Sequence, residues 1–269
     1  MDNNIIEVWS DNLESSFTEI RKLVQTYNYV TMDTEFPGVV AKPLGNFTSQ
    51  STYAYQQLRC NVDLLKVIQV GITFSDCYGN CPPRNTYQFN FHFDIDREMY
   101  AKDSLKLLVE AQLNFEKHRL QGIEVEEFGN LLITSGLILS RNVTWLSFHS
   151  SYDFAYLMKI VTCNPLPATE NEFFMFMNIL FPNFYDVKYL LRGSKYLKRG
   201  LQEIAEDLGL RRVGVQHQAG SDALLTRDVF FKVKEIFYTK EDITKHAVKL
   251  YGIECRVEED KVAICDLSL

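Results

Sequence analysis

The chain has 269 residues, of which 46% are hydrophobic and 13% aromatic, and it carries a formal net charge of −7. This composition is too apolar for a disordered chain, and the low glycine and proline content excludes a fibrous or low-complexity protein. The acidic balance argues against a protein that coats nucleic acid, but it is compatible with an enzyme whose site concentrates carboxylates.

The six cysteines include no C-x-x-C pair and have no histidine cluster beside them. Cys77 and Cys81 lie four positions apart, but a second ligand pair is missing, so we expect no zinc site. The first residues lack the basic and then apolar pattern of a signal peptide, and no run approaches the roughly 18 apolar residues of a membrane span. We therefore expect free thiols in the reducing environment of the cytoplasm or the nucleus, and no membrane partner.

The first part of the chain predicts one helix followed by three strands. Apolar residues at helical spacing predict a helix over residues 11–27. Residues 29–36, 67–74 and 87–93 are rich in β-branched and aromatic residues, which favours strands. Their order predicts a three-stranded meander with a turn at residues 79–84.

The second part predicts mostly helices, interrupted by short strands. The apolar spacing indicates helices over residues 102–115 and 123–139, a strand at 143–148 followed at once by a helix, a short strand at 185–189, and helices at 200–208 and 222–237. Strands followed by alternating strands and helices predict a mixed α/β sheet with helices packed on it. Because no repeat or long linker is visible, we expect a single domain over residues 1–269.

Asp33 and Glu35 lie two positions apart on the first predicted strand, so their side chains should point to the same face. Two neighbouring carboxylates repel each other, and burying them requires a cation such as a divalent metal ion. The alternative is a solvent-facing pair on an edge strand. The apolar flank and the Pro37-Gly38 turn favour the buried pair.

Asp153 lies where the strand at 143–148 gives way to a helix. It could be a third ligand. It could also belong to a helix cap, with Ser150 at the N-cap and Asp153 three residues later. Taken alone, this position favours the cap.

His217 and Asp222 form an H-x-A-x-x-D pattern at the start of the last long helix. Ser221 could cap this helix, with Asp222 in its first turn. His217, in the preceding loop, could be an ordinary exposed histidine, or it could reach the water that a metal-binding Asp222 helps to hold.

The three acidic motifs, in this order, resemble the DEDDh exonucleases, which have an RNase H-like fold. The resemblance implies a mixed central β-sheet with flanking α-helices. It assigns the catalytic set to Asp33, Glu35, Asp153, Asp222 and His217, with the four carboxylates as metal ligands and His217 as general base. Oxygen ligands select hard ions, so two Mg²⁺ or Mn²⁺ ions are the expected cofactors.

Five longer segments narrow the resemblance to one family. They are MDTEFPGVV (32–40), LRCNVDLLKVIQVGITF (58–74), WLSFHSSYDFAYL (145–157), FYDVKYL (184–190) and VQHQAGSDALLT (215–226). They resemble the Ccr-associated-factor deadenylases of the Pop-two type, catalytic subunits of the Ccr–Not complex, over residues of about 6–253. The chain departs from the family pattern at Ser151 and Ala155, where glycines are usual, and at Val215, where a proline is usual. None of these departures removes a ligand.

This resemblance implies removal of mRNA poly(A) tails from the 3′ end with release of AMP. It also implies two protein partners, a large Not scaffold and the second deadenylase of the complex. The adenine preference comes from the resemblance alone, and the segment after residue 253 lies outside it.

RNA phosphates could contact the basic stretch at 186–200, which contains Lys188, Arg192, Lys195, Lys198 and Arg199, and the Arg211-Arg212 pair that follows. Phe36 could stack on a terminal base. The alternatives are a solvated basic surface and a core phenylalanine.

Two other functions remain open. One is a DEDDh exonuclease that acts on short oligoribonucleotides or DNA 3′ ends, and the other is a scaffold subunit with dispensable activity. Two divalent ions would offset the four ligand carboxylates, which leaves a chain that is still acidic. We therefore expect weak unaided RNA binding and delivery to mRNA by partner subunits.

Overall fold

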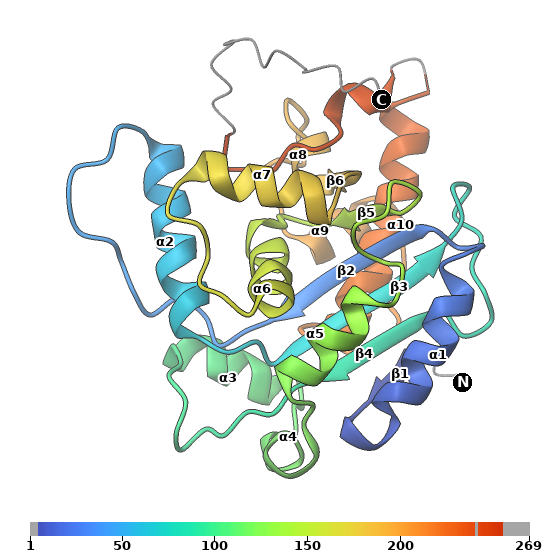
Figure 1. The fold of residues 1–269 in the computed structure, drawn as a ribbon. Helices are drawn as coiled ribbons and strands as arrows, with labels where there is room; N and C mark the ends of the chain where they lie inside the picture. Colours follow the sequence, from blue (N-terminus) through green and yellow to red (C-terminus); the bar gives the residue numbers. More distant parts are fainter. Residues whose placement is uncertain (1–4, 240–241, 255–269) are drawn as a thin grey trace, which may run out of the picture.

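The computed structural model describes residues 5–239 and 242–254, and these form a six-stranded mixed sheet with helices on both faces (Figure 1). The strand order is β1-β4-β3-β2-β5-β6. The strands are β1 (Ile5–Val8), β2 (Tyr29–Glu35), β3 (Gln69–Ser75), β4 (Thr86–Asn90), β5 (Thr144–Ser147) and β6 (Phe184–Asp186). The predicted meander is confirmed, because β2 pairs antiparallel with β3, and β3 pairs antiparallel with β4. The strands β1, β5 and β6 join the sheet through parallel pairings.

Ten helices are present in the described residues. They are α1 (Leu13–Leu23), α2 (Gln50–Leu64), α3 (Lys102–Glu110), α4 (Phe115–Gln121), α5 (Val125–Ile133), α6 (Ser151–Thr162), α7 (Glu170–Leu180), α8 (Val187–Leu190), α9 (Leu201–Asp207) and α10 (Ala219–Phe237). Short 3₁₀ turns add Ser10–Asn12 and Ile243–His246. No helix in this described part is both long and apolar enough to cross a membrane.

Two apolar layers hold the helices against the sheet. On one face, α1, α5 and α6 pack on β2, β3 and β4 through a large core that includes Phe17, Phe128 and Phe154. On the other face, α10 lies along the sheet and packs with α8 and α9 through Leu225, Val229 and other apolar residues (Figure 1). The sheet is therefore buried on both sides, and its central strands can carry functional residues into the interior.

Several predicted boundaries are wrong, one of them for a local reason. The helix expected over 102–115 ends at Glu110, and the one expected over 123–139 ends at Ile133. The strand expected at 185–189 stops at Asp186, whose carboxylate accepts a hydrogen bond from the backbone N–H of Lys188 at 2.9 Å and begins α8.

Four elements had no counterpart in the predictions, namely β1, α2, α4 and α7. The α7 segment is apolar at most positions, so it has little helical contrast between its faces. It does carry a capping box, in which Thr169 and Glu172 each accept a hydrogen bond from the backbone N–H of the other, and this T-x-x-E signal marks its start.

Candidate active site

The strand β2 carries Asp33 and Glu35 at its carboxyl end, beside β3. In the β2–β3 register, Asp33 lies opposite Gly71 and Glu35 lies opposite Gln69. A Cβ atom at Gly71 would lie 2.0 Å from the carbonyl oxygen of Ala219, the first residue of α10. Only glycine lets α10 approach β3 this closely, and this approach brings α10 to the two carboxylates.

The helix α6 supplies Asp153, which is 6% exposed. Its carboxylate accepts hydrogen bonds from the hydroxyls of Thr34 at 2.6 Å and Ser147 at 3.3 Å. Ser150 occupies the N-cap position of α6 but forms no capping hydrogen bond through its side chain. The predicted N-cap position is therefore confirmed, but its capping hydrogen bond is absent, and the Asp153 carboxylate is bound to β2 and β5 instead.

The first turn of α10 supplies Asp222, which is 8% exposed. One carboxylate oxygen accepts a hydrogen bond from the guanidinium of Arg212 at 2.6 Å, and the other accepts one from the backbone N–H of His217 at 2.9 Å. Asp222 does lie in the first turn, but the alternative in which Ser221 caps this helix is wrong, because α10 begins at Ala219 and the Ser221 hydroxyl donates to the carbonyl of Val213 at 2.7 Å.

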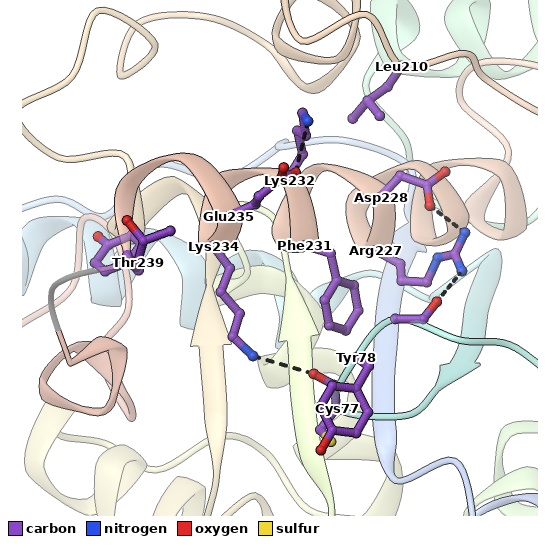
Figure 2. Close-up of a pocket in the computed structure, with 12 residues that line it drawn as sticks. Cys77, Tyr78, Leu210, Arg227, Asp228, Phe231, Lys232, Lys234, Glu235 and Thr239 are labelled. Atoms are coloured by element: carbon purple, nitrogen blue, oxygen red, sulfur yellow. Dashed lines mark hydrogen bonds and ion pairs between the residues drawn. The ribbon is translucent and has the colours of Figure 1, made fainter.

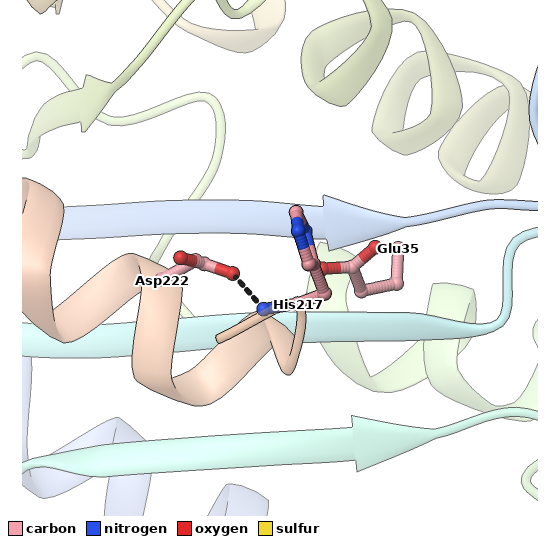
Figure 3. A group of neighbouring side chains, drawn as sticks. All are labelled: Glu35, His217 and Asp222. Atoms are coloured by element: carbon pink, nitrogen blue, oxygen red, sulfur yellow. Dashed lines mark hydrogen bonds between the residues drawn. The ribbon is translucent and has the colours of Figure 1, made fainter. Parts of the chain in front are cut away.

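His217 lies in the turn that precedes α10, with a φ of 61°. This left-handed conformation is uncommon for a residue other than glycine. One ligand atom from each of Glu35, His217 and Asp222 lies within 4.8 Å of the others, and the three side chains gather beside the end of β2 (Figure 3). They come from separate segments of the sequence that the fold brings together.

Burial and repulsion between carboxylates destabilise the ionised forms of Asp33 and Glu35. Burial and then repulsion by Asp153, Asp222 and Glu35 raise the pKa of Asp33 well above its usual range. Burial and repulsion by Asp222 and Asp153 do the same to the pKa of Glu35. Burial also raises the pKa of Asp153 to about 7, although its hydrogen bonds from Thr34 and Ser147 oppose this rise. A partly buried cluster of oxygen ligands with excess negative charge suits hard divalent cations, so these residues fit a Mg²⁺ or Mn²⁺ site.

A set of side-chain amides fixes the start of α10 against the sheet, and the sequence predictions missed it. The side-chain oxygen of Gln69 accepts a hydrogen bond from the backbone N–H of Ala219 at 3.2 Å, and that of Gln88 accepts one from the backbone N–H of Gly220 at 2.8 Å. Both N–H groups lie in the first turn of α10, where they have no partner within the helix. Both amides also donate to the side-chain oxygen of Gln218, at 3.2 and 2.7 Å. The signal in the sequence was the presence of glutamines on otherwise apolar strands, where a buried amide needs partners.

Asp186 is a second missed residue, although the segment that contains it was part of the resemblance. Its carboxylate is fully buried and accepts hydrogen bonds from four backbone N–H groups. These belong to His149 at 2.9 Å, Ser150 at 3.3 Å, Lys188 at 2.9 Å and Tyr251 at 2.9 Å. These bonds join the turn before α6 to the C-terminal part of the described chain.

Three of the residues expected to contact RNA have partners within the protein. Phe36 stacks on Tyr152, with ring centroids 5.0 Å apart. Lys188 is 8% exposed, and its ammonium donates to the carbonyl of Arg199. Arg199 itself forms an ion pair with Asp207. These contacts favour structural roles for all three residues.

Lys195 and Lys198 are exposed and remain candidates for phosphate contacts. Arg212 departs from the expectation of an RNA contact, because its side chain is 10% exposed and bound to Asp222.

A cavity of about 630 Å³ lies between the tip of the β3–β4 hairpin and the C-terminal half of α10 (Figure 2). Its lining includes Phe231 and Lys234, and the Lys234 ammonium donates to the carbonyl of Cys77 at 3.4 Å. None of the 12 lining residues is His217 or a carboxylate of the cluster. The cavity is therefore separate from the candidate active site.

Comparison with known proteins assigns this arrangement to a family of nucleases. The model of the CAF1 family ribonucleases matches residues 8–127 and 133–230. The poly(A) ribonuclease pop2 of Schizosaccharomyces pombe is 48% identical over 250 residues, which cover 93% of this chain and 75% of that protein. CCR4-NOT transcription complex subunit 7 of Caenorhabditis elegans is 48% identical over 239 residues, which cover 87% of this chain and 77% of that protein.

Solved structures agree with these matches. The Mg²⁺- and Mn²⁺-bound form of S. pombe Pop2p superimposes with a TM-score of 0.90 at 48% identity, over 93% of this chain and all of that chain. Yeast CAF1, co-crystallized with the NOT1 MIF4G domain, gives a TM-score of 0.78 at 34% identity, over 92% of this chain and 96% of that chain.

The E. coli exonuclease I chain in complex with a dA16 oligonucleotide shares only the fold, with a TM-score of 0.54 at 12% identity over 78% of this chain and 41% of that chain. The expected RNase H-like exonuclease fold is confirmed. The chain belongs to the CAF1 family of ribonucleases.

Proposed function

We propose that this chain is a metal-dependent 3′-to-5′ exoribonuclease that shortens mRNA poly(A) tails and releases AMP. The observation that carries the proposal is the gathering of Glu35 and Asp222 beside His217, with Asp33 and Asp153 close enough to repel these carboxylates electrostatically. Membership of a ribonuclease family and 48% identity to a poly(A) ribonuclease support the substrate.

In this proposal, Asp33, Glu35, Asp153 and Asp222 hold two divalent ions, Mg²⁺ or Mn²⁺. The excess negative charge of the cluster supports this assignment, as does a relative solved with both ions. When bound, such ions lower the pKa of a coordinated water and offset negative charge on the phosphate. Asp153 is held by hydroxyls from two strands, so it is oriented before any ion arrives.

His217 accepts the proton of the attacking water in this proposal. A ring nitrogen of His217 lies within 4.8 Å of carboxylate oxygens of Glu35 and Asp222, so it would be within reach of a water held between them. The hydrogen bond from its backbone N–H to Asp222 fixes the turn, and histidine is the side chain that most often serves as a general base. The bond that breaks joins the phosphorus to the 3′ oxygen of the penultimate nucleotide, which leaves AMP as the product.

We assign phosphate contacts outside the metal site to Lys195 and Lys198, because both side chains are exposed. We propose that one domain spans residues 1–269, with its core at about 6–253. The tail after residue 254 lies outside the described residues.

The chain would work as a subunit of a Ccr–Not complex, bound to a large Not scaffold and to a second deadenylase. A relative named as a CCR4-NOT subunit and a CAF1 co-crystallized with NOT1 support this assembly. We place the complex in the cytoplasm and, secondarily, the nucleus. The free thiols of Cys60, Cys77, Cys81 and Cys163 fit these reducing compartments.

The test is a degradation assay with the purified chain on 5′-labelled oligoadenylate, oligouridylate and single-stranded DNA, with Mn²⁺ and with EDTA. We expect a ladder of single-nucleotide steps from the 3′ end of oligoadenylate only, and only with the ion. Asp33→Asn should abolish the ladder in a folded protein, whereas Asp11→Asn, at an exposed position, should not.

Each alternative predicts a different result in the same assay. Equal rates on oligouridylate or DNA would favour an exonuclease of broader substrate class. No metal-dependent cleavage in a single-turnover reaction would favour the scaffold function.

A further inference from the structure

Arg212 is a nearly buried cation in direct contact with the carboxylate cluster. The side chains of Arg212 and Asp222 are 10% and 11% exposed, and their ion pair has an N–O distance of 2.6 Å. Arginine stays charged at any physiological pH, so this positive charge is permanent. Its neighbour Arg211 is exposed, which shows that the fold selects one of two adjacent arginines for the interior.

Three hydrogen bonds hold the guanidinium in one orientation. It donates to Asp222 at 2.6 Å and Ser221 at 3.0 Å through one terminal nitrogen, and to Gln202 on α9 at 2.7 Å through Nε. These bonds connect α9, the segment that carries His217, and the first turn of α10. The guanidinium is therefore fixed to the protein independently of any ligand.

Asp222 is consequently held at both oxygens. One bonds to Arg212 and the other to the backbone N–H of His217. Each carboxylate oxygen has a second lone pair, so both can still bind a metal ion. The positive charge also favours the ionised forms of the nearby Asp33 and Glu35.

We propose that Arg212 is a positioning residue that orients Asp222 and supplies a permanent positive charge to the metal site. This inference rests on the proposed function. Without ions, the guanidinium offsets part of the repulsion among four carboxylates. Two divalent ions would balance the charge of the four carboxylates. The guanidinium would then leave the site with one net positive charge. That charge matches the single negative charge of the scissile phosphodiester.

This role predicts opposite effects on ion binding and on catalysis. A positive charge beside the site repels divalent cations, so its removal should strengthen Mn²⁺ binding, provided that the His217 N–H still holds Asp222. The same removal should slow turnover, because the phosphate loses an attracting charge and Asp222 loses one of its two contacts. A purely structural role for Arg212 predicts weaker ion binding together with slower turnover.

The experiment compares Arg212→Met with Arg212→Lys, which keeps the charge but not the guanidinium geometry. Mn²⁺ affinity is measured by titration calorimetry, and kcat and KM are measured on oligoadenylate. For Arg212→Met we expect Mn²⁺ affinity to rise by roughly three- to tenfold. We expect kcat/KM to fall by at least about tenfold, with part of the loss in KM. Arg212→Lys should restore near-normal affinity and part of kcat.

The matched control is Arg97→Met, because that side chain is 84% exposed, and it should change neither quantity. If Arg212→Met does not fold, Arg212→Gln removes the same charge with a side chain that can still donate to Asp222. Unchanged or weaker Mn²⁺ binding by the neutral variant, with a normal wild type, would overturn this inference alone. A wild-type chain that neither binds Mn²⁺ nor cleaves RNA would instead overturn the proposed function.

Discussion

The hydroxyl of Thr34 donates a 2.6 Å hydrogen bond to the carboxylate of Asp153, and this buried contact joins β2 to α6 across 119 positions of the sequence. Thr34 lies between the two acidic residues of β2, and its side chain points to the opposite face from theirs. One strand therefore contributes to the site from both faces. Asp33 and Glu35 belong to the cluster directly, and Thr34 holds a carboxylate that comes from another element.

This contact can be tested by Thr34→Val, which keeps the shape of the side chain but removes its hydroxyl. We expect kcat to fall by about tenfold, and stability to fall by about 1–2 kcal/mol because a buried carboxylate loses a hydrogen bond. The control is Thr73→Val. Thr73 is also a buried threonine of the sheet, but its hydroxyl pairs with that of Thr86 at 2.9 Å. The Thr73→Val protein should be less stable than the wild type but should keep its activity. A Thr34→Val protein with normal kcat would contradict the positioning role of Thr34.

The function of His217 can be separated from that of a metal ligand. Because its ring lies within 4.8 Å of ligand atoms of Glu35 and Asp222, either function is geometrically open. As a general base, His217→Asn should lower kcat by roughly 10²- to 10⁴-fold and leave Mn²⁺ affinity unchanged. Asp222→Asn should lower both. Calorimetry and single-turnover rates measure the two effects, and a matching loss of Mn²⁺ binding in His217→Asn would show that the histidine is a ligand.

The amide set at the start of α10 predicts a combined loss of stability and activity. In Gln88→Leu, the backbone N–H of Gly220 and the side-chain oxygen of Gln218 each lose a buried partner. We expect a loss of about 2–4 kcal/mol in urea unfolding. We also expect a lower kcat, because the His217 turn is no longer fixed to the sheet. If urea stability falls while kcat at 25 °C stays normal, the amides support the fold without positioning the site.

A buried histidine far from the carboxylate motifs predicts an acid-sensitive fold. His118 is 1% exposed, its Nδ1 contacts the carbonyl of Phe91 at 2.8 Å, and burial lowers its pKa from 6.5 to about 4. Between these values the unfolded chain binds a proton that the folded chain does not. Above pH 6.5 the titration of His118 therefore does not lower the free energy of unfolding. As the pH falls from 6.5 toward 4, proton binding to the unfolded chain lowers this free energy progressively.

The size of this effect follows from the pKa difference. At pH 5, His118 should account for a loss of about 2 kcal/mol relative to neutral pH. Urea unfolding at pH 7.5 and pH 5.0 measures it. His118→Gln should lose correspondingly less stability on acidification, because glutamine does not titrate. Equal acid sensitivity in the two proteins would assign the effect to other groups.

Local sequence patterns were sufficient to predict the central strands and the helices with clear apolar spacing. The alternation on β2 follows from covalent geometry, so the opposed directions of Thr34 and its acidic neighbours were predictable. The elements β1, α2 and α7 were not, since four residues of an edge strand and helices with weak apolar contrast give little local signal. Their formation depends on packing against distant parts of the chain.

The sequence by itself determined the order of the carboxylates, the candidate base and the family, because these are carried by short motifs whose residue types are set by chemistry. Only the tertiary structure decided which polar groups lie inside and what they touch. It placed Arg212 against Asp222 while Arg211 stayed exposed, and it paired Lys188 with a backbone carbonyl. The physical reason is that the energy of a charge or a hydrogen bond depends on burial and on its partners, and both are created when remote segments pack together.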